Sequence, residues 1–342
     1  MGSKRDAPVL ASVRRVGLLK TAAIGDTLLL AGLTEDVRRA YPGVTIVLIT
    51  GPDNRGVAAL LPGGVDEHVV VSPKRPLAAV AAVRRAALDV IVDCGSWPRF
   101  DALVATLSGA RYRVGFRTRG QFRHYGLDYA IEHSNAVHER ENYVRLLAGI
   151  GVDSVAVPRV EAPRILAPSQ CPAAPYVVVH AWAGGYRHEA KEWPASRWAE
   201  LATEFMARGW KVVLSGSRSD AERTEALRRT LADAGVPSTN AAGKYTLTEL
   251  ADVFAASEVV VSVNTGVMHL SALVGARTVS LEGPTPLRRW GPLGPRVRSV
   301  VSTLPGCGYL NLGFEYAGNR TDCMDGVSVQ AVGHAVDELM KL

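Results

Sequence analysis

Short β-branched segments alternate with longer amphipathic segments rich in Ala, Leu and Arg along this chain of 342 residues. In the first half, the β-branched segments are residues 13–20, 44–51 and 88–94. The alternation is typical of βαβ units, which place successive strands parallel in one sheet. From Asp26 to Tyr41, apolar residues recur at three- and four-residue spacing ahead of a Pro-Gly pair, so we expect one helix there.

A segment rich in Pro and Ala, residues 156–175, interrupts this alternation. It shows no sustained periodicity, as is typical of a linker between compact domains. The pattern then restarts, with strand-like segments at 176–182, 210–217, 258–263 and 277–283 and helix-like segments at 196–209, 219–235, 247–257 and 265–275. The sequence therefore predicts an α/β protein of two Rossmann-like domains facing each other across a cleft, with ligands at the carboxyl ends of the strands.

Composition narrows the function classes. The 39 Lys and Arg exceed the 33 Asp and Glu by six, and they are dispersed, which favours a small anionic ligand such as a nucleotide over a nucleic acid. No apolar run reaches the roughly 18–20 residues that cross a bilayer, so we expect a cytoplasmic protein. Cys94, Cys171, Cys307 and Cys323 form no C-x-x-C pair, so we expect reduced thiols rather than disulfides or a zinc site.

Several motifs of common α/β enzymes are absent from the sequence. Residues 20–26 read KTAAIGD, where a dinucleotide-binding enzyme carries G-x-G-x-x-G after its first strand. The chain also lacks G-x-x-x-x-G-K-[ST], H-E-x-x-H and G-x-S-x-G. These absences argue against dehydrogenases, P-loop NTPases, zincins and α/β-hydrolases.

Polar residues follow two of the predicted strands directly. Asp26 lies after the first strand, where a carboxylate is either a helix N-cap or a general base. Asn264, Thr265 and Gly266 follow strand 258–263 at the start of a helix, whose free amides suit a diphosphate, and His269 lies in the first turn. The alternative for this second group is a helix cap with a packed histidine.

Two weaker signals lie in loops of the second half. Lys191 follows strand 176–182, where a lysine either neutralises a phosphate or is a solvated surface charge. Asp220 and Glu222 follow strand 210–217 and offer carboxylates to ribose hydroxyls, although acids are also common in the first turn of a helix.

These signals occur in a defined order, together with further short motifs. They are GD at 25–26, K-x-W-P at 191–194, GSRSD at 216–220, AGKYTLTELA at 242–251, SVNTGVMHL at 262–270, GPT-x4-W-G-P at 283–292 and CMDGVSVQAV at 323–332. In this combination the chain resembles glycosyltransferase family 9, the ADP-heptose:lipopolysaccharide heptosyltransferases, over nearly its whole length. The resemblance implies a GT-B fold with an acceptor domain (1–160), a nucleotide-sugar donor domain (161–325) and a last helix (326–342) that returns to the N-terminal domain.

The resemblance also implies an inverting transfer that uses neither a metal nor a cofactor. Asp26 would deprotonate the acceptor hydroxyl. Lys191 would contact the diphosphate or sugar, Asp220 the ribose and Tyr245 the adenine. The implied donor-binding residues are Trp182, Lys191, Asp220, Tyr245, Asn264, Thr265, Gly266 and His269. The family usually has Asp where this chain has Asn264, which replaces a charge by a neutral amide and leaves the donor sugar open.

Three functions remain open from the sequence. The leading one transfers a heptose or related sugar from ADP-heptose to a lipopolysaccharide core or a small molecule. The second uses a different nucleotide sugar and a soluble natural product. The third is a catalytically silent nucleotide-binding partner protein. Residues 115–126, GFRTRGQFRHYG, would suit an anionic acceptor and a peripheral membrane contact, or they form an ordinary solvated loop.

Overall fold

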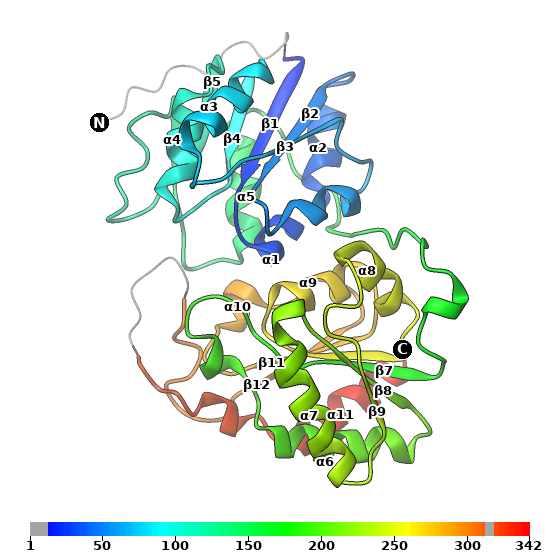
Figure 1. Cartoon of the computed structure of the whole chain (residues 1–342). Helices are drawn as coiled ribbons and strands as arrows, with labels where there is room; N and C mark the ends of the chain where they lie inside the picture. Colours follow the sequence, from blue (N-terminus) through cyan, green and yellow to red (C-terminus); the bar gives the residue numbers. More distant parts are fainter. Residues whose placement is uncertain (1–12, 312–317) are drawn as a thin grey trace. The chain divides into compact units, whose positions relative to one another are not determined.

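The chain forms two compact units, Met1–Arg159 and Val160–Leu342, in a computed structural model that describes residues 13–311 and 318–342 (Figure 1). Each unit contains a six-stranded sheet, with strand orders β3-β2-β1-β4-β5-β6 and β12-β11-β10-β7-β8-β9. Every strand pair in both sheets is parallel. The predicted α/β architecture with two doubly wound sheets is therefore confirmed.

The first sheet is covered by helices on both faces. Helices α3 and α4 pack on one face against apolar side chains of β1, β2 and β4, including Leu19, Ile49 and Ile91. Helices α2 and α5, which pack against each other, lie on the opposite face (Figure 1). The elements are β1 (Arg15–Lys20), α1 (Ile24–Leu28), α2 (Leu33–Ala40), β2 (Thr45–Thr50), η2 (Arg55–Leu60), β3 (Glu67–Val70), α3 (Pro76–Arg85), β4 (Val90–Asp93), α4 (Arg99–Leu107), β5 (Tyr112–Arg117), β6 (Tyr129–Glu132) and α5 (Glu139–Ala148).

The second sheet has the same construction. Its central strands β7, β10 and β11 are buried along their whole length, as parallel strands between two helical layers must be. The elements are η3 (Pro168–Gln170), β7 (Tyr176–His180), η4 (His188–Lys191), α6 (Ala195–Ala207), β8 (Lys211–Ser215), η5 (Arg218–Asp220), α7 (Ala221–Asp233), β9 (Ser238–Asn240), α8 (Leu247–Ala255), β10 (Val259–Val263), α9 (Gly266–Leu273), β11 (Thr278–Glu282), α10 (Leu287–Trp290), β12 (Val297–Val301), η6 (Cys323–Gly326) and α11 (Val329–Met340).

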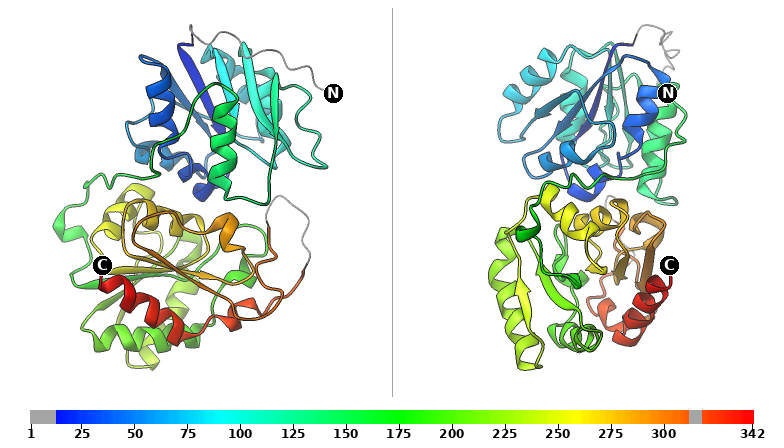
Figure 2. Two further views of the ribbon diagram at one scale, coloured as in Figure 1. Left: turned by 180° about the vertical axis from the view of Figure 1, so that it is seen from behind. Right: turned by 90° about the vertical axis from the view of Figure 1, so that its right-hand side faces the viewer.

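The last helix, α11, belongs to the second unit. Its residues Val329, Val332, Val336 and Leu339 are buried in the core that α6 and α7 form with the second sheet. In Figure 2, α11 lies beside that sheet, and it packs against α6, β11 and β12. The spacing of these four apolar residues places their side chains on one face of α11, and this face is buried against the second unit. The expectation that this helix returns to the N-terminal domain is corrected accordingly.

The helix expected over 26–41 is two helices, α1 and α2. Gly32 separates them with φ = +83°, a left-handed conformation that glycine adopts without strain. A Cβ at this position would lie 3.2 Å from the carbonyl oxygen of Val157, so the neighbouring chain also limits the space. The apolar periodicity is continuous in the sequence, but the first helix ends at Leu28 after five residues, and Gly32 is the N-cap of the second helix.

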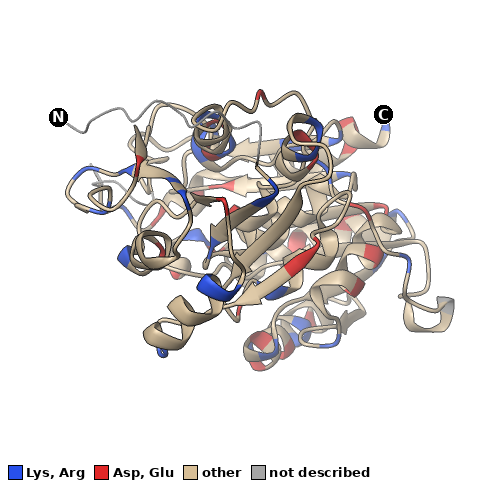
Figure 3. Ribbon diagram, turned by 90° about the horizontal axis from the view of Figure 1, so that it is seen from above, with Lys and Arg blue, Asp and Glu red and all other residues tan. Residues whose placement is uncertain are grey.

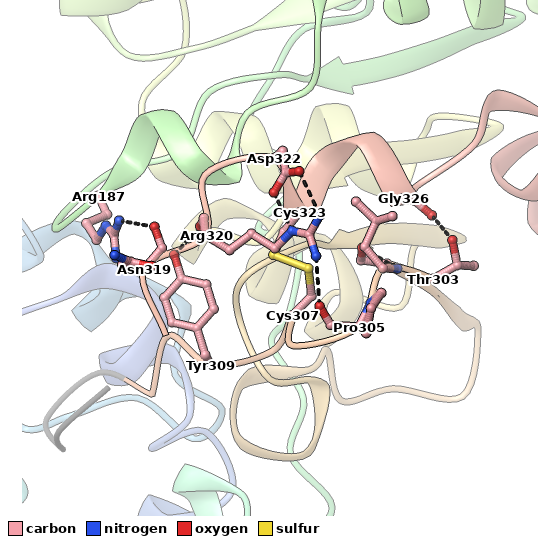
Figure 4. The surroundings of a disulfide bond; sticks show 12 residues. Arg187, Thr303, Pro305, Cys307, Tyr309, Asn319, Arg320, Asp322, Cys323 and Gly326 are labelled. Carbon is pink, nitrogen blue, oxygen red and sulfur yellow. Dashed lines mark hydrogen bonds and ion pairs between the residues drawn. A yellow bond between two sulfur atoms is a disulfide. The ribbon is translucent and has the colours of Figure 1, made fainter. Parts of the chain in front are cut away.

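The expectation of four reduced thiols is wrong for two of them. Cys307 and Cys323 form a disulfide across a sequence separation of 16 residues, whereas Cys94 and Cys171 are free thiols. The disulfide joins the segment after β12 to η6 (Figure 4). The sequence alone did not reveal this pair because the fold, and not a short motif, brings the two cysteines together.

Charged residues of both signs are interspersed along the described ribbon, as expected from the dispersed basic excess (Figure 3). Within the described residues, no helix combines the length and apolarity that crossing a membrane requires.

Candidate functional site

Asp26 lies in α1, just beyond the carboxyl end of β1. The N-cap of α1 is Ala23, so the helix-capping alternative for Asp26 is wrong. The Asp26 carboxylate lies 2.9 Å from the ammonium of Lys20, the last residue of β1. The Asp26 side chain retains 24% exposure, whereas that of Lys20 retains 2%. Asp26 is therefore accessible at the sheet edge where ligands of doubly wound folds bind.

Lys20 is a buried cation that the sequence analysis missed. Burial alone would lower its pKa, but the nearby carboxylates of Asp26, Glu139 and Asp101 outweigh burial and raise the pKa above its usual value. Lys20 is therefore an ammonium at neutral pH and holds the Asp26 carboxylate by an ion pair. The signal in the sequence was a lysine that directly follows the apolar run VGLL in the strand RVGLLK.

Two buried acids fix the loops around this position. Asp101 accepts hydrogen bonds from the backbone N–H and the hydroxyl of Thr21. Asp93 pairs with the buried guanidinium of Arg123. Burial raises the pKa of Asp93 to about 6, although Arg123 opposes the shift. Arg123 is therefore a structural residue of the stretch 115–126, whereas Arg119 in the same stretch is exposed.

The start of α9 forms the core of the candidate donor site in the second unit. Thr265 is the N-cap residue, its backbone is extended, and its side chain makes no capping hydrogen bond. Gly266 is the first helical residue, and both residues are half-buried. His269 is buried in the first turn. A helix start without a side-chain cap presents backbone N–H groups and positive partial charge, which suit a phosphate.

Asn264, directly before this helix start, is held from the inside. Its Nδ2 donates to Glu282 Oε2 at 2.8 Å and to the backbone carbonyl of Trp290 at 3.0 Å. Glu282 is fully buried, and burial raises its pKa to about 8, although the polar side chains of Ser280 and Asn264 oppose the shift. Glu282 was not identified from the sequence.

Lys191 is the last residue of η4, and it is buried rather than a solvated surface charge. Its Nζ donates a hydrogen bond to the carbonyl of Gly184 at 2.7 Å, so the loop 183–190 folds back over it. Burial lowers the pKa of Lys191 to about 8, with Glu192 opposing the shift. An ammonium has three N–H groups, and two of them have no described partner here.

Trp182 and Asp220 meet through Arg223. The Trp182 indole N–H donates to the Thr224 hydroxyl at 2.7 Å, and the Arg223 guanidinium lies 4.4 Å from the Trp182 ring centroid. Asp220 accepts hydrogen bonds from the Ser217 N–H at 2.7 Å and from Arg223 at 2.6 Å. Burial opposes ionisation of Asp220, but Ser217 and Arg223 prevail and lower its pKa. Both carboxylate oxygens are thus engaged, so a ribose hydroxyl would compete with these partners.

Tyr245 precedes α8 and is half-buried. Its hydroxyl donates to the carbonyl of Gln170 at 3.0 Å, which ties the chain before β7 to this loop. The aromatic ring, not the hydroxyl, is therefore the part of Tyr245 that offers contact area to a base.

The predicted donor residues all follow neighbouring strands of one sheet. Asn264, Lys191, Asp220 and Tyr245 come after β10, β7, β8 and β9, which are adjacent in this order. The carboxyl ends of parallel strands share one edge, and neighbouring strands are about 4.8 Å apart, so the row extends over about 14 Å. Asp26 lies in the first unit. No group of three or more His, Cys, Asp or Glu side chains suited to a metal ion occurs in residues 13–311 and 318–342.

Comparison with protein families places most of the chain in a known family. The model of glycosyltransferase family 9 (heptosyltransferase) matches residues 82–307. Among curated relatives, lipopolysaccharide heptosyltransferase 1 of Pseudomonas aeruginosa is 39% identical over 116 residues, which are 33% of this chain and 30% of that protein. The chain thus aligns with about a third of the length of the first relatives. Lipopolysaccharide heptosyltransferase 1 of Salmonella typhimurium is 28% identical over 79% of this chain and 89% of its own length.

Solved structures with the same fold cover nearly the whole chain. The ADP-heptose LPS heptosyltransferase II of E. coli has a TM-score of 0.76 at 20% identity, covering 96% of this chain and 98% of that protein. An E. coli heptosyltransferase solved with ADP has a TM-score of 0.71 at 21% identity, covering 95% and 99%. At these identities the likeness establishes the fold, which is the expected GT-B class.

Proposed function

The chain belongs to glycosyltransferase family 9 (heptosyltransferase), and we propose that it transfers a heptose, or a related sugar, from an ADP-sugar to an acceptor hydroxyl. The observation that carries the proposal is the row of polar residues along the carboxyl ends of four neighbouring strands, β10, β7, β8 and β9. A row of this length suits an extended ligand that combines a base, a ribose, a diphosphate and a sugar.

The parts of the donor follow from the chemistry along the row. The backbone amides of Thr265 and Gly266 at the start of α9 and the Lys191 ammonium are assigned to the diphosphate. The amides carry positive partial charge and the ammonium a full positive charge, and both kinds of group donate hydrogen bonds to phosphate oxygens. The Tyr245 ring is assigned to the adenine and Asp220 to the ribose. Trp182, in the loop after β7, and His269, in α9, support this surface. Asn264 adjoins the diphosphate amides and is assigned to the sugar.

In the proposed reaction, Asp26 accepts the proton of the acceptor hydroxyl as its oxygen attacks C1 of the sugar. The bond between C1 and the diphosphate oxygen breaks on the opposite face, so the anomeric configuration inverts. The departing ADP gains negative charge, which the helix-start amides and Lys191 stabilise. Lys20 holds the Asp26 carboxylate in place without taking the proton.

For the acceptor we propose an anionic saccharide of the lipopolysaccharide core type. The curated relatives are named for lipopolysaccharide. In addition, Arg117, the last residue of β5, and Arg119, in the loop after it, are exposed at the carboxyl edge of the first sheet. Exposed arginines at a ligand-binding edge suit carboxylate or phosphate groups of an acceptor.

Donor binding and turnover test the proposal separately. ADP is expected to raise the melting temperature of the protein, whereas UDP and GDP are expected to raise it less. Stabilisation by UDP with no effect of ADP would overturn the donor assignment. Turnover is measured with ADP-heptose and a core acceptor, and Asp26→Asn is expected to lower kcat by roughly 10²–10⁴-fold.

The matched control is Asp53→Asn, which removes an exposed acid from the same unit and is expected to leave turnover unchanged. An Asp26→Asn variant with wild-type turnover would remove Asp26 as the base. A wild-type protein that binds ADP but transfers no sugar to any core acceptor would favour a silent nucleotide-binding partner.

A further inference from the structure

Asn264 and Glu282 lie side by side at the carboxyl ends of two neighbouring strands. The register of β10 and β11 pairs Val263 with Leu281. The next residue along the chain is Asn264 after Val263 and Glu282 after Leu281. Both side chains are buried, with Asn264 retaining 8% exposure and Glu282 none. The two residues therefore form one polar unit under the start of α9.

The hydrogen bonds of this unit fix which end of the Asn264 amide faces a ligand. The backbone carbonyl of Trp290 can only accept, so the atom of Asn264 that faces it at 3.0 Å must be the donor nitrogen. The second N–H of the same nitrogen points to Glu282 Oε2 at 2.8 Å. With both N–H groups engaged inward, Oδ1 is the part of the amide left for a ligand, and no described residue donates to it.

Glu282 is costly in this position. The residue is fully buried, it pairs with no cation among the described residues, and its Oε1 has no hydrogen-bond partner there. Two further buried polar atoms close by in sequence, Thr285 Oγ1 and Trp290 Nε1, also lack a described partner. Burying an unpaired polar group costs free energy, so a cluster of such groups beside a candidate site points to a functional constraint.

The position of Asn264 in the chain indicates what its oxygen would meet. Thr265 and Gly266, the next two residues, begin α9 and are assigned to the donor diphosphate. In a nucleotide sugar, the sugar is bonded directly to that diphosphate. An acceptor atom one residue before the diphosphate amides is therefore suited to a hydroxyl of the sugar, which donates a hydrogen bond.

We propose that Glu282 is a positioning residue for sugar recognition: it holds the Asn264 amide so that Oδ1 accepts a hydrogen bond from a hydroxyl of the donor sugar. The inference rests on the proposed function, because it assigns the sugar end of the same donor. Asn264 is the residue that touches the sugar, and Glu282 acts through it. The site thereby reads a hydroxyl with a neutral acceptor whose orientation is fixed.

The test separates the sugar from the nucleotide. Glu282→Met removes the inner acceptor while keeping an unbranched apolar side chain, which frees the Asn264 amide to turn. We expect the KM for ADP-heptose to rise roughly 10-fold, the loss of about one hydrogen bond, while the Kd for ADP changes less than about twofold. Glu282→Gln retains an oxygen that accepts from Asn264 and should restore the KM to within about threefold of wild type. Glu258→Met, at the amino end of β10, is the matched control and should change neither constant.

The outcomes are distinct. A Glu282→Met variant with unchanged KM, or with equal weakening of ADP and ADP-heptose binding, would overturn the inference, because the effect would be absent or merely structural. If Glu282→Met does not fold, Asn264→Ala replaces it with the same expected split between the KM for ADP-heptose and the Kd for ADP. If the wild-type protein neither binds ADP nor uses ADP-heptose, the proposed function fails and this inference fails with it.

Discussion

Lys20 provides the most direct test of how the first unit holds its proposed base. The substitution Lys20→Met removes the charge and keeps the length of the side chain. In the folded protein, Lys20 Nζ lies 2.9 Å from Asp26 and 5.9 Å from the centroid of the Tyr143 ring, and the side chain is 2% exposed. The carboxylates of Glu139 and Asp101 also act on it. Removing the cation thus leaves a cluster of acids without its central positive charge.

The magnitude follows from the burial. Removal of one partner of a buried ion pair costs about 3–5 kcal/mol, because the remaining charge stays buried and uncompensated. Asp26 retains 24% exposure, so water relieves part of this cost. We therefore expect the free energy of unfolding to fall by about 3 kcal/mol, the lower end of that range.

Urea unfolding, followed by circular dichroism and intrinsic fluorescence, measures the change. The control is Glu67→Gln, which breaks the Arg15–Glu67 pair in the same unit, where the side chains are 28% and 44% exposed. Exposed pairs contribute less than about 1 kcal/mol, so this variant should stay close to wild type. Adding Asp26→Asn to Lys20→Met should recover part of the lost stability.

The reasoning is refuted if Lys20→Met costs no more than Glu67→Gln. Lys20 would then not act as the charge that balances the acids around it. The reasoning is also refuted if Asp26→Asn destabilises the Lys20→Met background further, since removing an uncompensated charge must help.

Three further predictions concern the second unit. Burial lowers the pKa of Lys191 to about 8, so its ammonium is lost above that pH and kcat/KM for the donor should fall between pH 7 and 9. Lys191→Met should abolish this fall, and a flat pH profile in the wild type would contradict the proposed role of Lys191. The Cys307–Cys323 disulfide closes a loop between residues 16 positions apart, so its reduction by dithiothreitol should lower the free energy of unfolding by about 3 kcal/mol. The stability of the Cys307→Ser, Cys323→Ser double variant should not respond to dithiothreitol. Asp252 accepts three backbone hydrogen bonds from residues 164–166, so Asp252→Ala should lower the free energy of unfolding by about 3 kcal/mol and speed proteolysis within 156–175. An Asp252→Ala variant that resists proteases as well as the wild type would contradict this role of Asp252.

The segment 156–175 also shows why its structure could be predicted from the sequence only in part. Its Pro and Ala content and lack of periodicity predicted a linker. In the structure, residues 164–166 are held on the carboxylate of Asp252 in α8. That anchor depends on an acid about 87 residues further along the chain, and local sequence patterns carry no information about such a pairing.

The alternation of apolar periods predicted the strands and helices well. Segments 44–51 and 258–263 became β2 and β10 with boundaries within one residue, because fully buried parallel strands leave a strong apolar signature. The helix over 26–41 failed at Gly32, because the φ of +83° there is set by the turn and by the approach of Val157, not by the apolar spacing.

The expectation that Cys307 and Cys323 are reduced failed for a related reason. The disulfide joins the segment after β12 to η6, and contacts to this region come from the loop after β7. Figure 4 shows Arg187 beside Asn319 and Tyr309. Arg187 donates to the Asn319 carbonyl at 2.9 Å and lies 5.5 Å from the Tyr309 ring centroid. The loop that carries Lys191 is thereby tied to the disulfide segment, a connection that no spacing of cysteines reveals.

The two groups that the sequence analysis missed share one position in the fold. Lys20 ends β1 and Glu282 ends β11, and each is an ionisable residue that closes a buried strand. In a sequence, such a residue is naturally taken as the point where the strand reaches solvent. In parallel sheets, however, the carboxyl end of a strand meets the ligand edge, where an ionisable side chain can remain buried if it holds a neighbouring side chain. Lys20 holds Asp26, and Glu282 holds Asn264. Since an unpaired buried polar group is costly, an ionisable residue at the end of a central parallel strand indicates a positioned partner in the following loop or beside the neighbouring strand.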